Sequence, residues 1–193
     1  MQNNILIKPL ILAAGLGSRM QIPKIFMSFK DKYFLDMITE SIYSIFAEPL
    51  IIIRKEFEDD FKKTFPKNNE YLINKNPENG MFSSVLIGIN YIKSSHICII
   101  PIDHPFVNAD TYIRLKDNTY MNPNSIIKPT HKNIPGHPII IPNKIKNFIN
   151  PEIQSLNQLT KTSSLNTIYL EVEDRTILKN INTIKDLTDE KHI

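Results

Sequence analysis

The sequence has one cysteine, few glycines and no long apolar run. The single cysteine, Cys98, excludes a disulfide within the chain, and its place in the apolar segment Ile97–Ile100 predicts a buried thiol. One thiol of this kind suits a reducing compartment, so we expect a cytoplasmic protein. No apolar stretch reaches the roughly 18 residues that a membrane span requires, so we expect no membrane partner.

A large excess of charge of one sign is also missing. The formal net charge is +3, which is too small to predict nucleic-acid binding. A pocket that holds several phosphates would account for this excess equally well. The chain has no internal repeat and no linker rich in Gly, Ser or Pro, so we expect one domain over residues 1–193.

Short apolar runs do occur, and they alternate with amphipathic segments. The runs predict strands at Pro9–Ala14, Leu50–Ile53, Tyr71–Ile73, Ile97–Ile102, Ser125–Lys128, Pro138–Ile141 and Thr167–Val172. The segments between them predict helices at Asp31–Ala47, Glu56–Phe65, Met81–Ile92 and Ala109–Asn118. This alternation indicates a mostly parallel, Rossmann-like sheet in a three-layer α/β/α sandwich. Ligands of such folds bind beyond the carboxyl ends of the strands, here the loop after Ala14 and the turn at Asp103.

The segment after the first expected strand has the features of an anion-binding loop. It reads Leu12-Ala13-Ala14-Gly15-Leu16-Gly17-Ser18-Arg19 and continues to Pro23-Lys24. Successive N–H groups in a glycine turn can bind an anion, and Arg19 and Lys24 add positive charge. Met20 stands where a dinucleotide-binding fingerprint needs its third glycine, and the Gly-Lys-Ser/Thr ending of a P-loop is absent. We therefore expect a phosphate-binding loop of another kind, with a purely structural turn as the alternative.

This loop, written Leu-Ala-Ala-Gly-x-Gly-x-Arg-Met…Pro-Lys, resembles the signature of the nucleotidyltransferase superfamily with a GT-A-like fold. Further similar segments are Asn76–Ser84 with Gly88, Pro101–Val107, and Gly136–Pro138. They resemble the Asn-Pro…Gly-Met-x-Ser-Ser…Gly, Gly-Asp-x-Pro and Gly-His-Pro segments of the molybdenum cofactor cytidylyltransferases, within the MobA-like family. Ile102 replaces the glycine of the second segment.

The resemblance implies transfer of a nucleoside monophosphate from an NTP to a phosphorylated acceptor, with Mg²⁺ as the cofactor. It implies catalytic roles for Arg19, Lys24 and Asp103. The implied nucleotide-binding residues are Leu12, Ala13, Ala14, Gly15, Gly17, Ser18, Arg19, Lys24, Asn76, Gly80, Ser83 and Ser84. His137 is expected to face the acceptor, whereas His104 and His131 are interpreted as loop histidines. The attacking phosphate monoester is already anionic near neutral pH, so no catalytic base is required.

The chain departs from this family at two places. Asn180-Ile181-Asn182 stands where many cytidylyltransferases carry Asp-Ile-Asp. An amide oxygen can still coordinate Mg²⁺, so we expect Asp103 to bind the metal with help from Asn180 or Asn182. The Gly-Asp-x-Gly-Ala-Arg segment expected near Glu152–Thr160 is missing, which leaves the acceptor open.

Ala14 gives an indication of which nucleotide is used, because the guanylyltransferase branch usually has Leu-Ala-Gly-Gly where this chain has Leu-Ala-Ala-Gly. The methyl group of Ala14 would narrow the base site, which favours CTP. The leading hypothesis is a molybdopterin cytidylyltransferase with a recipient molybdoenzyme as a further partner. The alternatives are a cytidylyl- or uridylyltransferase for a sugar phosphate or alcohol phosphate, and a protein that binds NTP or cofactor without turnover.

Overall fold

The computed structural model describes residues 5–17, 22–66 and 69–188. Within these ranges, eight strands form one sheet in the order β10-β7-β9-β6-β1-β4-β5, with β8 paired to β7. Their bounds are β1 Ile7–Leu12, β4 Leu50–Arg54, β5 Glu70–Asn74, β6 His96–Pro101, β7 Ile126–His131, β8 Ile134–Pro135, β9 Ile139–Pro142 and β10 Thr167–Glu171. A small hairpin of β2 (Ser28–Phe29) and β3 (Lys32–Tyr33) lies apart from this sheet.

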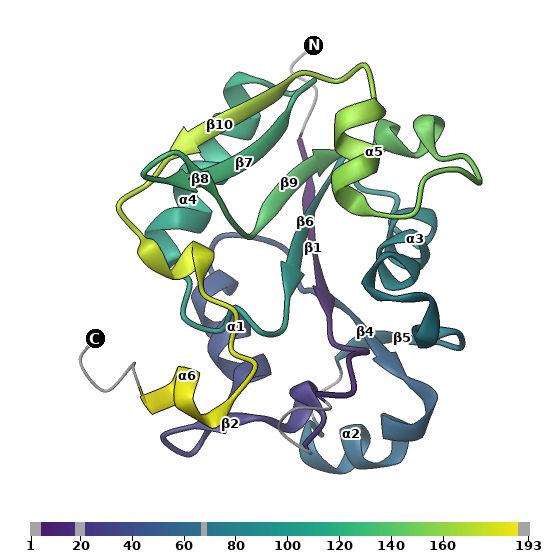
Figure 1. Cartoon of the computed structure of the whole chain (residues 1–193), viewed down its shortest axis with the longest axis vertical. Coiled ribbons are helices and arrows are strands. Elements are labelled where there is room, and N and C mark those ends of the chain that lie inside the picture. The colour runs from purple at the N-terminus through teal and green to yellow at the C-terminus, as the bar shows by residue number, and fades with distance from the viewer. Residues whose placement is uncertain (1–4, 18–21, 67–68, 189–193) are drawn as a thin grey trace.

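The sheet is mostly parallel, as the sequence predicts. Strand β1 lies between β4 and β6 and is parallel to both, β5 is parallel to β4, and β10 is parallel to β7. Strand β9 runs antiparallel between β6 and β7, so β6 and β7 point the same way. The carboxyl ends of the parallel strands therefore share one edge, toward which the arrowheads of β1 and β6 point in Figure 1.

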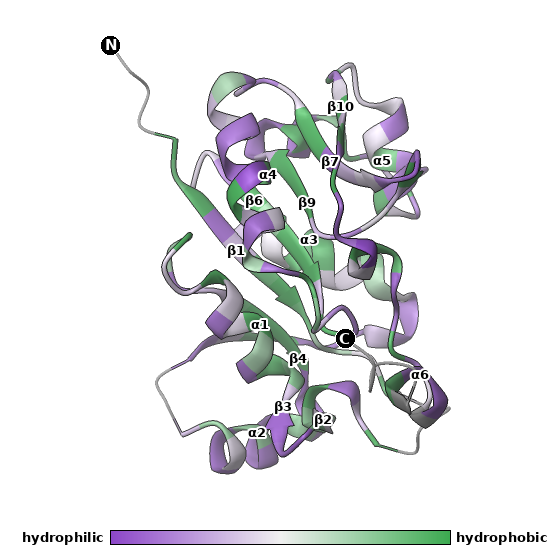
Figure 2. Cartoon of the chain, turned by 90° about the vertical axis from the view of Figure 1, so that its left-hand side faces the viewer, coloured by the Kyte–Doolittle hydropathy of each residue, from purple (hydrophilic) through white to green (hydrophobic). Residues whose placement is uncertain are grey.

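Helices cover both faces of the sheet, which confirms the three-layer α/β/α sandwich. One face packs against α1 (Phe34–Ile42), α2 (Glu58–Thr64) and α4 (Ala109–Met121). The other packs against α3 (Met81–Tyr91), α5 (Leu156–Thr162) and the 3₁₀ helix η4 (Asn143–Phe148). Figure 2 shows the apolar strands in the interior between these layers.

The residues of β1 explain how one strand serves both layers. Ile7 and Ile11 belong to the cluster under α1 and α4, whereas Leu10 and Leu12 belong to the cluster under α3. Side chains alternate between the faces of a strand, so the successive apolar residues Leu10, Ile11 and Leu12 fit a sheet that is covered on both faces. Cys98, in β6, is fully buried as expected, and burial raises the pKa of its thiol.

Helix α3 approaches the sheet unusually closely at one glycine. A Cβ atom on Gly88 would lie 2.3 Å from a methyl carbon of Leu10 in β1, so a larger residue there would displace the Leu10 side chain.

Helix α1 is shorter than the expected span Asp31–Ala47. Lys30 and Asp31 have φ angles of 47° and 61°, which form the tight turn between β2 and β3 and delay the helix until Phe34. Among the described residues, no helix has the length and apolarity needed to cross a membrane.

Candidate functional site

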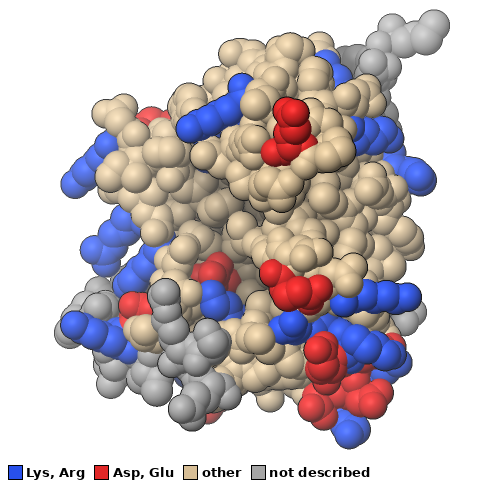
Figure 3. Space-filling model, turned by 45° about the vertical axis from the view of Figure 1, so that its right-hand side comes forward, with Lys and Arg blue, Asp and Glu red and all other residues tan. Residues whose placement is uncertain are grey.

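A lysine, a carboxylate and an amide meet at the carboxyl edge of the sheet. The Nζ atom of Lys24 donates hydrogen bonds to Oδ2 of Asp103 at 2.5 Å and to Oδ1 of Asn182 at 2.7 Å. The side chains of Lys24 and Asp103 are each 17% exposed, so a ligand can still reach them. Figure 3 shows a face that is hollowed across its middle, with acidic and basic side chains along the margin of the hollow.

Backbone hydrogen bonds hold together the segments that carry these groups. The amide of Ile102 donates to the carbonyl of Leu12 at 3.2 Å, which extends the pairing of β1 and β6 beyond the strand ends. The amide of Ile181 donates to the carbonyl of Asp103 at 2.9 Å, which ties the C-terminal segment to the β6 loop. Lys24 begins the 3₁₀ helix η1 (Lys24–Phe26), after the loop that leaves β1. The two places selected from the sequence therefore form one site.

Asp186 orients the backbone at Asn182. Its Oδ2 atom accepts hydrogen bonds from the amides of Asn182 and Thr183, each at 2.8 Å. The bond from the Asn182 amide is the largest of the effects that lower the pKa of Asp186. The Thr183 hydroxyl oxygen in turn accepts from the Asp186 amide at 3.3 Å, a reciprocal capping arrangement at the start of α6 (Ile184–Thr188). Asp186 is thus a positioning residue for Asn182.

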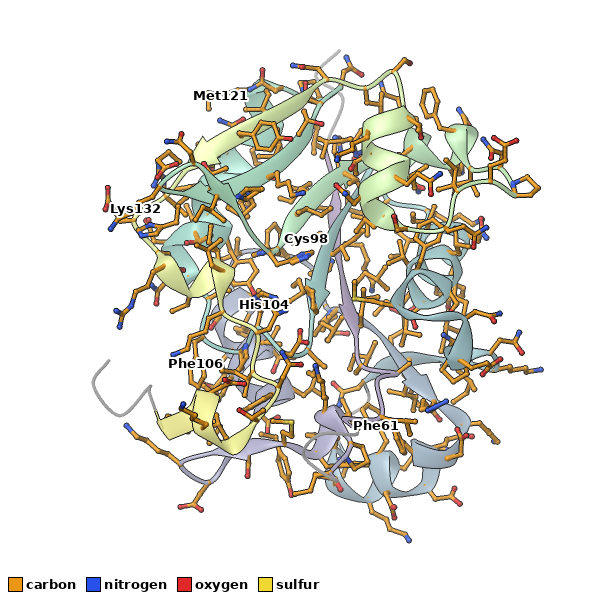
Figure 4. All side chains as sticks on the ribbon, viewed as in Figure 1. Phe61, Cys98, His104, Phe106, Met121 and Lys132 are labelled. Atoms are coloured by element: carbon orange, nitrogen blue, oxygen red, sulfur yellow. The ribbon has the colours of Figure 1, made fainter. Side chains whose placement is uncertain are left out.

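Two histidines lie beside Asp103. The ring centroids of His104 and His137 are 5.2 Å apart, and Nε2 of His104 lies 4.0 Å from Oδ1 of Asp103. Burial lowers the pKa of both imidazoles, and that of His137 falls to about 4. Both rings are therefore neutral at pH 7. His104, labelled in Figure 4, follows β6 in a loop, as expected, but its side chain is buried.

The glycine loop is described as far as Gly17. Gly17 has a φ angle of 63°, and a Cβ atom on it would lie 2.2 Å from the carbonyl oxygen of Ile22, so this position requires glycine. At Gly15 there is space, since the nearest atom to an added Cβ is Cδ of Lys24 at 4.0 Å. Ser18 and Arg19, for which nucleotide contacts are predicted, lie outside the described residues.

The other residues of this loop lie at the end of β1. The side chains of Leu12, Ala13 and Ala14 are buried, and Ala14 packs in the apolar cluster that includes Phe82 of α3. The amide of Ala13 donates to the carbonyl of Ile52 at 2.9 Å, so backbone pairing continues to the start of the loop.

A second polar cluster lies where β5 ends and α3 begins. The side-chain amide of Asn74 donates to the hydroxyl oxygens of Ser83 at 2.8 Å and Ser84 at 2.9 Å. Its Oδ1 atom accepts from the amide of Asn76 at 2.9 Å. The Ser83 hydroxyl donates to the Gly80 carbonyl at 2.7 Å. Asn74 therefore fixes both the turn at Asn76 and the first turn of α3.

This cluster follows β5 and lies at the same carboxyl edge of the sheet as Lys24 and Asp103. Gly80 has a φ angle of 79° with no atom within 4 Å of an added Cβ, so its surface is open. Ser84 is buried, and its hydroxyl faces Asn74. The nucleotide-binding roles of Asn76, Gly80, Ser83 and Ser84 stay predictions.

Oxygen atoms dominate the part of the site that could hold a cation. Asp103 supplies a carboxylate and Asn182 an amide oxygen, while Asn180 is exposed on the same C-terminal segment. Within the described residues there is no group of three or more His, Cys, Asp or Glu side chains that could hold a metal. A metal here would therefore rely on few protein ligands, which is the usual situation for Mg²⁺ bound together with phosphates.

The fold and the site define a class: α/β proteins that bind a ligand at the carboxyl edge of a mostly parallel sheet, with a glycine loop and a lysine after the first strand. The chain belongs to the MobA-like NTP transferase family, whose domain matches residues 9–174. By family it is a nucleotidyltransferase.

Named relatives agree with this family. The chain is 27% identical to a probable molybdenum cofactor guanylyltransferase of Methanocaldococcus jannaschii, over 95% of this chain and 98% of that protein. It is 23% identical to the molybdenum cofactor cytidylyltransferase of Escherichia coli, over 94% of each chain. The crystal structure of molybdopterin-guanine dinucleotide biosynthesis protein A from Archaeoglobus fulgidus has the same fold, with a TM-score of 0.71, 16% identity, and coverage of 95% and 96% of the two chains.

Asn74 and Asp186 were not singled out from the sequence, and His104 was interpreted only as a loop histidine. Asp186 had a usable signal, since Thr183 and Asp186 have the Ser/Thr-x-x-Asp/Glu spacing of a helix start. Asn74 also had one, because it ends an apolar strand at the predicted ligand edge. His104 had none, because a histidine after a strand gives no indication of whether its ring turns inward.

Proposed function

We propose that this chain transfers CMP from CTP to the phosphate of a molybdopterin-type acceptor and releases pyrophosphate. An oxygen of the acceptor phosphate attacks the α-phosphorus, and the bond from that phosphorus to the oxygen that bridges it to the β-phosphate breaks. The observation that carries the proposal is the ammonium of Lys24, bonded to oxygens of Asp103 and Asn182 where the glycine loop ends.

The side chains at this position suit a polyphosphate and its counter-cation. Lys24 has a long flexible stem, so its ammonium can turn from Asp103 to a phosphate oxygen and neutralise the departing pyrophosphate. The oxygens of Asp103 and Asn182 already surround a cationic group, and oxygen ligands are those that Mg²⁺ prefers. Mg²⁺ bound there would neutralise charge on the triphosphate.

The acceptor side of the site needs no general base. The second pKa of a phosphate monoester is about 6, so the attacking oxygen is already anionic at pH 7. The neutral imidazoles of His104 and His137 fit this reaction, because neither adds charge beside Asp103. His137 is proposed to contact the acceptor, and Asp186 to hold Asn182 in place.

CTP is proposed on the basis of Ala14, which stands where guanylyltransferases usually have a second glycine. One named relative is a guanylyltransferase and another a cytidylyltransferase, so the relatives do not decide the base. The Ala14 side chain is buried against the cluster that includes Phe82, so its methyl group would act on the base site through that wall. Those two names both refer to the molybdenum cofactor, which supports a molybdopterin-type acceptor for this chain.

The test is pyrophosphate release with Mg²⁺, for CTP and GTP in turn, with molybdopterin, a sugar phosphate or an alcohol phosphate as acceptor. We expect turnover with CTP and molybdopterin. Preference for GTP would reverse the choice of base, and preference for another phosphate would reverse the acceptor. Tight NTP binding without release from any acceptor would show a binding protein instead of an enzyme.

A further inference from the structure

A second basic pocket lies on the α5 face of the sheet, away from Lys24 and Asp103. It is a cavity of about 220 Å³ between β7, β10 and α5. Lys128 and Tyr169 line it from the strands, and Asn157, Thr160 and Lys161 line it from the helix. Figure 1 shows α5 beside the part of the sheet where β7 and β10 lie.

The two lysines share this cavity without a counter-ion from the described part of the chain. Neither Lys128 nor Lys161 takes part in the ion pairs found there, and no carboxylate lines the cavity. Lys128 is half-buried, and burial and the charge of Lys161 lower the pKa of its ammonium. Like charges in a partly buried space destabilise each other, and a bound anion would relieve this repulsion.

The rest of the lining adds polar groups that can donate hydrogen bonds. The side-chain amide of Asn157 lies on the helix side, and the hydroxyl-bearing ring of Tyr169 is 60% exposed at the rim. Tyr169 is the register partner of Lys128 in the parallel pairing of β10 with β7. The positive charge and the polar lining therefore converge from two adjacent strands and one helix.

The size of the cavity limits what it can hold. Its volume is about 220 Å³. A pocket for a whole drug-sized ligand is usually about 300–1,000 Å³. The cavity therefore fits one anionic group, such as a phosphate, at the end of a larger molecule.

The pocket is linked to the site at the sheet edge by neighbouring strands. Lys128 lies in β7, next to Ile127, which pairs with Ile140 of β9, and His137 precedes β9 in the turn beside His104. We propose that Lys128 and Lys161 form a second anion-binding subsite, which holds an anionic group of the acceptor other than the phosphate that reacts. The identity of this ligand as the acceptor rests on the proposed function.

Inorganic phosphate tests the subsite without any turnover. Amide resonances of the whole chain are followed by NMR as phosphate is added at pH 7. We expect saturable shifts at Thr167 and Tyr169 in the wild type, and their loss in a Lys128→Gln/Lys161→Gln double variant. Lys146→Gln, which removes an exposed lysine of η4, should keep these shifts. Absence of shifts at Thr167 and Tyr169 in the wild type would overturn the proposal.

Steady-state kinetics then test whether the anionic group bound by Lys128 and Lys161 belongs to the acceptor or to the nucleotide. The double variant should raise the KM for the acceptor at least about tenfold, because it removes two charged hydrogen-bond donors, and leave the KM for CTP unchanged. An unchanged acceptor KM, or a rise in the KM for CTP alone, would refute the assignment. If no acceptor is turned over, the proposed function fails, and the phosphate titration by itself decides whether the anion subsite exists.

Discussion

The Nζ atom of Lys24 and the Oδ2 atom of Asp103 lie 2.5 Å apart, although 79 positions separate the two residues in the sequence. They meet because β1 and β6 are adjacent and parallel, so the segments that leave both strands emerge at one edge. In this arrangement each side chain neutralises the other. A carboxylate can bind a metal cation and an ammonium can bind a phosphate. Both partners of the ion pair could therefore bind a complex of a metal ion with a triphosphate.

Removing either charge of this pair should stop transfer. Lys24→Met and Asp103→Asn are each expected to lower kcat/KM by at least about 10²-fold, the scale of one preorganised electrostatic contact. The Lys24→Met/Asp103→Asn double variant should have a higher Tm than either single variant, because the singles leave one partly buried charge without its partner. Pyrophosphate release and thermal unfolding are the measurements, with Lys146→Met as the control. Wild-type turnover in either single variant would contradict the assignment.

Asp186→Asn should weaken nucleotide binding through Asn182. The neutral amide is a poorer acceptor for the amides of Asn182 and Thr183, so we expect the KM for CTP to rise several-fold with a smaller change in kcat. Hydrogen bonds lower the pKa of Asp186 in the folded state. The carboxylate therefore stabilises the fold fully above its pKa in the unfolded chain, about 4, and this stabilisation is lost as the pH falls through the lower folded-state pKa. Asp117→Asn, on the exposed side of α4, is the control; equal kinetics in the two variants would argue against positioning by Asp186.

Stability should decrease in mild acid because of the buried histidines. The folded-state pKa of His137 is about 4, below the value of about 6.5 in an unfolded chain, so the unfolded state binds more protons between these values. The contribution of His137 to the free energy of unfolding is therefore expected to be constant above pH 7 and to fall from pH 6.5 toward pH 4. Urea unfolding of wild type and His137→Leu at several pH values checks this, and the variant should show the shallower decline. Identical slopes for the two proteins would be evidence against it.

The two loop glycines should respond differently to alanine. Gly17→Ala forces a left-handed φ on alanine and places its Cβ against the Ile22 carbonyl, so we expect about 1–3 kcal/mol of destabilisation together with lost activity. Gly15→Ala has space in the folded chain, so its Tm should stay at the wild-type value while the KM for CTP rises. Urea unfolding and steady-state kinetics measure both effects. A Gly15→Ala protein with normal kinetics would remove Gly15 from the nucleotide site.

Removal of divalent cations should abolish turnover. EDTA is expected to stop pyrophosphate release and added Mg²⁺ to restore it. Asp103→Asn should raise the Mg²⁺ concentration needed for half-maximal rate more than Asn182→Ala does, because only Asp103 contributes a negative charge. Full activity in EDTA would refute the magnesium proposal.

Much of the fold follows from the sequence because β1 and β6 are apolar at successive positions, a pattern that fits a sheet covered on both faces. The same pattern led to Asp103 and to the loop before Lys24, since ligand sites lie beyond the carboxyl ends of such strands. The direction of β9 could not be predicted, because the pairing of distant segments depends on contacts that a local pattern does not contain. The inward turn of His104 was beyond prediction for the same reason: its environment is made by residues far away in the chain.

The reversed strand β9 has a consequence for how such a protein can diversify. Because β9 runs antiparallel to β6 and starts at the edge where β6 ends, the turn that carries His137 lies at the same edge as Asp103 but precedes its strand. Insertions or substitutions in this turn can reshape the wall near His137 while the pairing of β1 with β6, and with it the contact of Lys24 with Asp103, is left intact. Selectivity for the acceptor can therefore change in evolution without altering the residues proposed to bind the triphosphate.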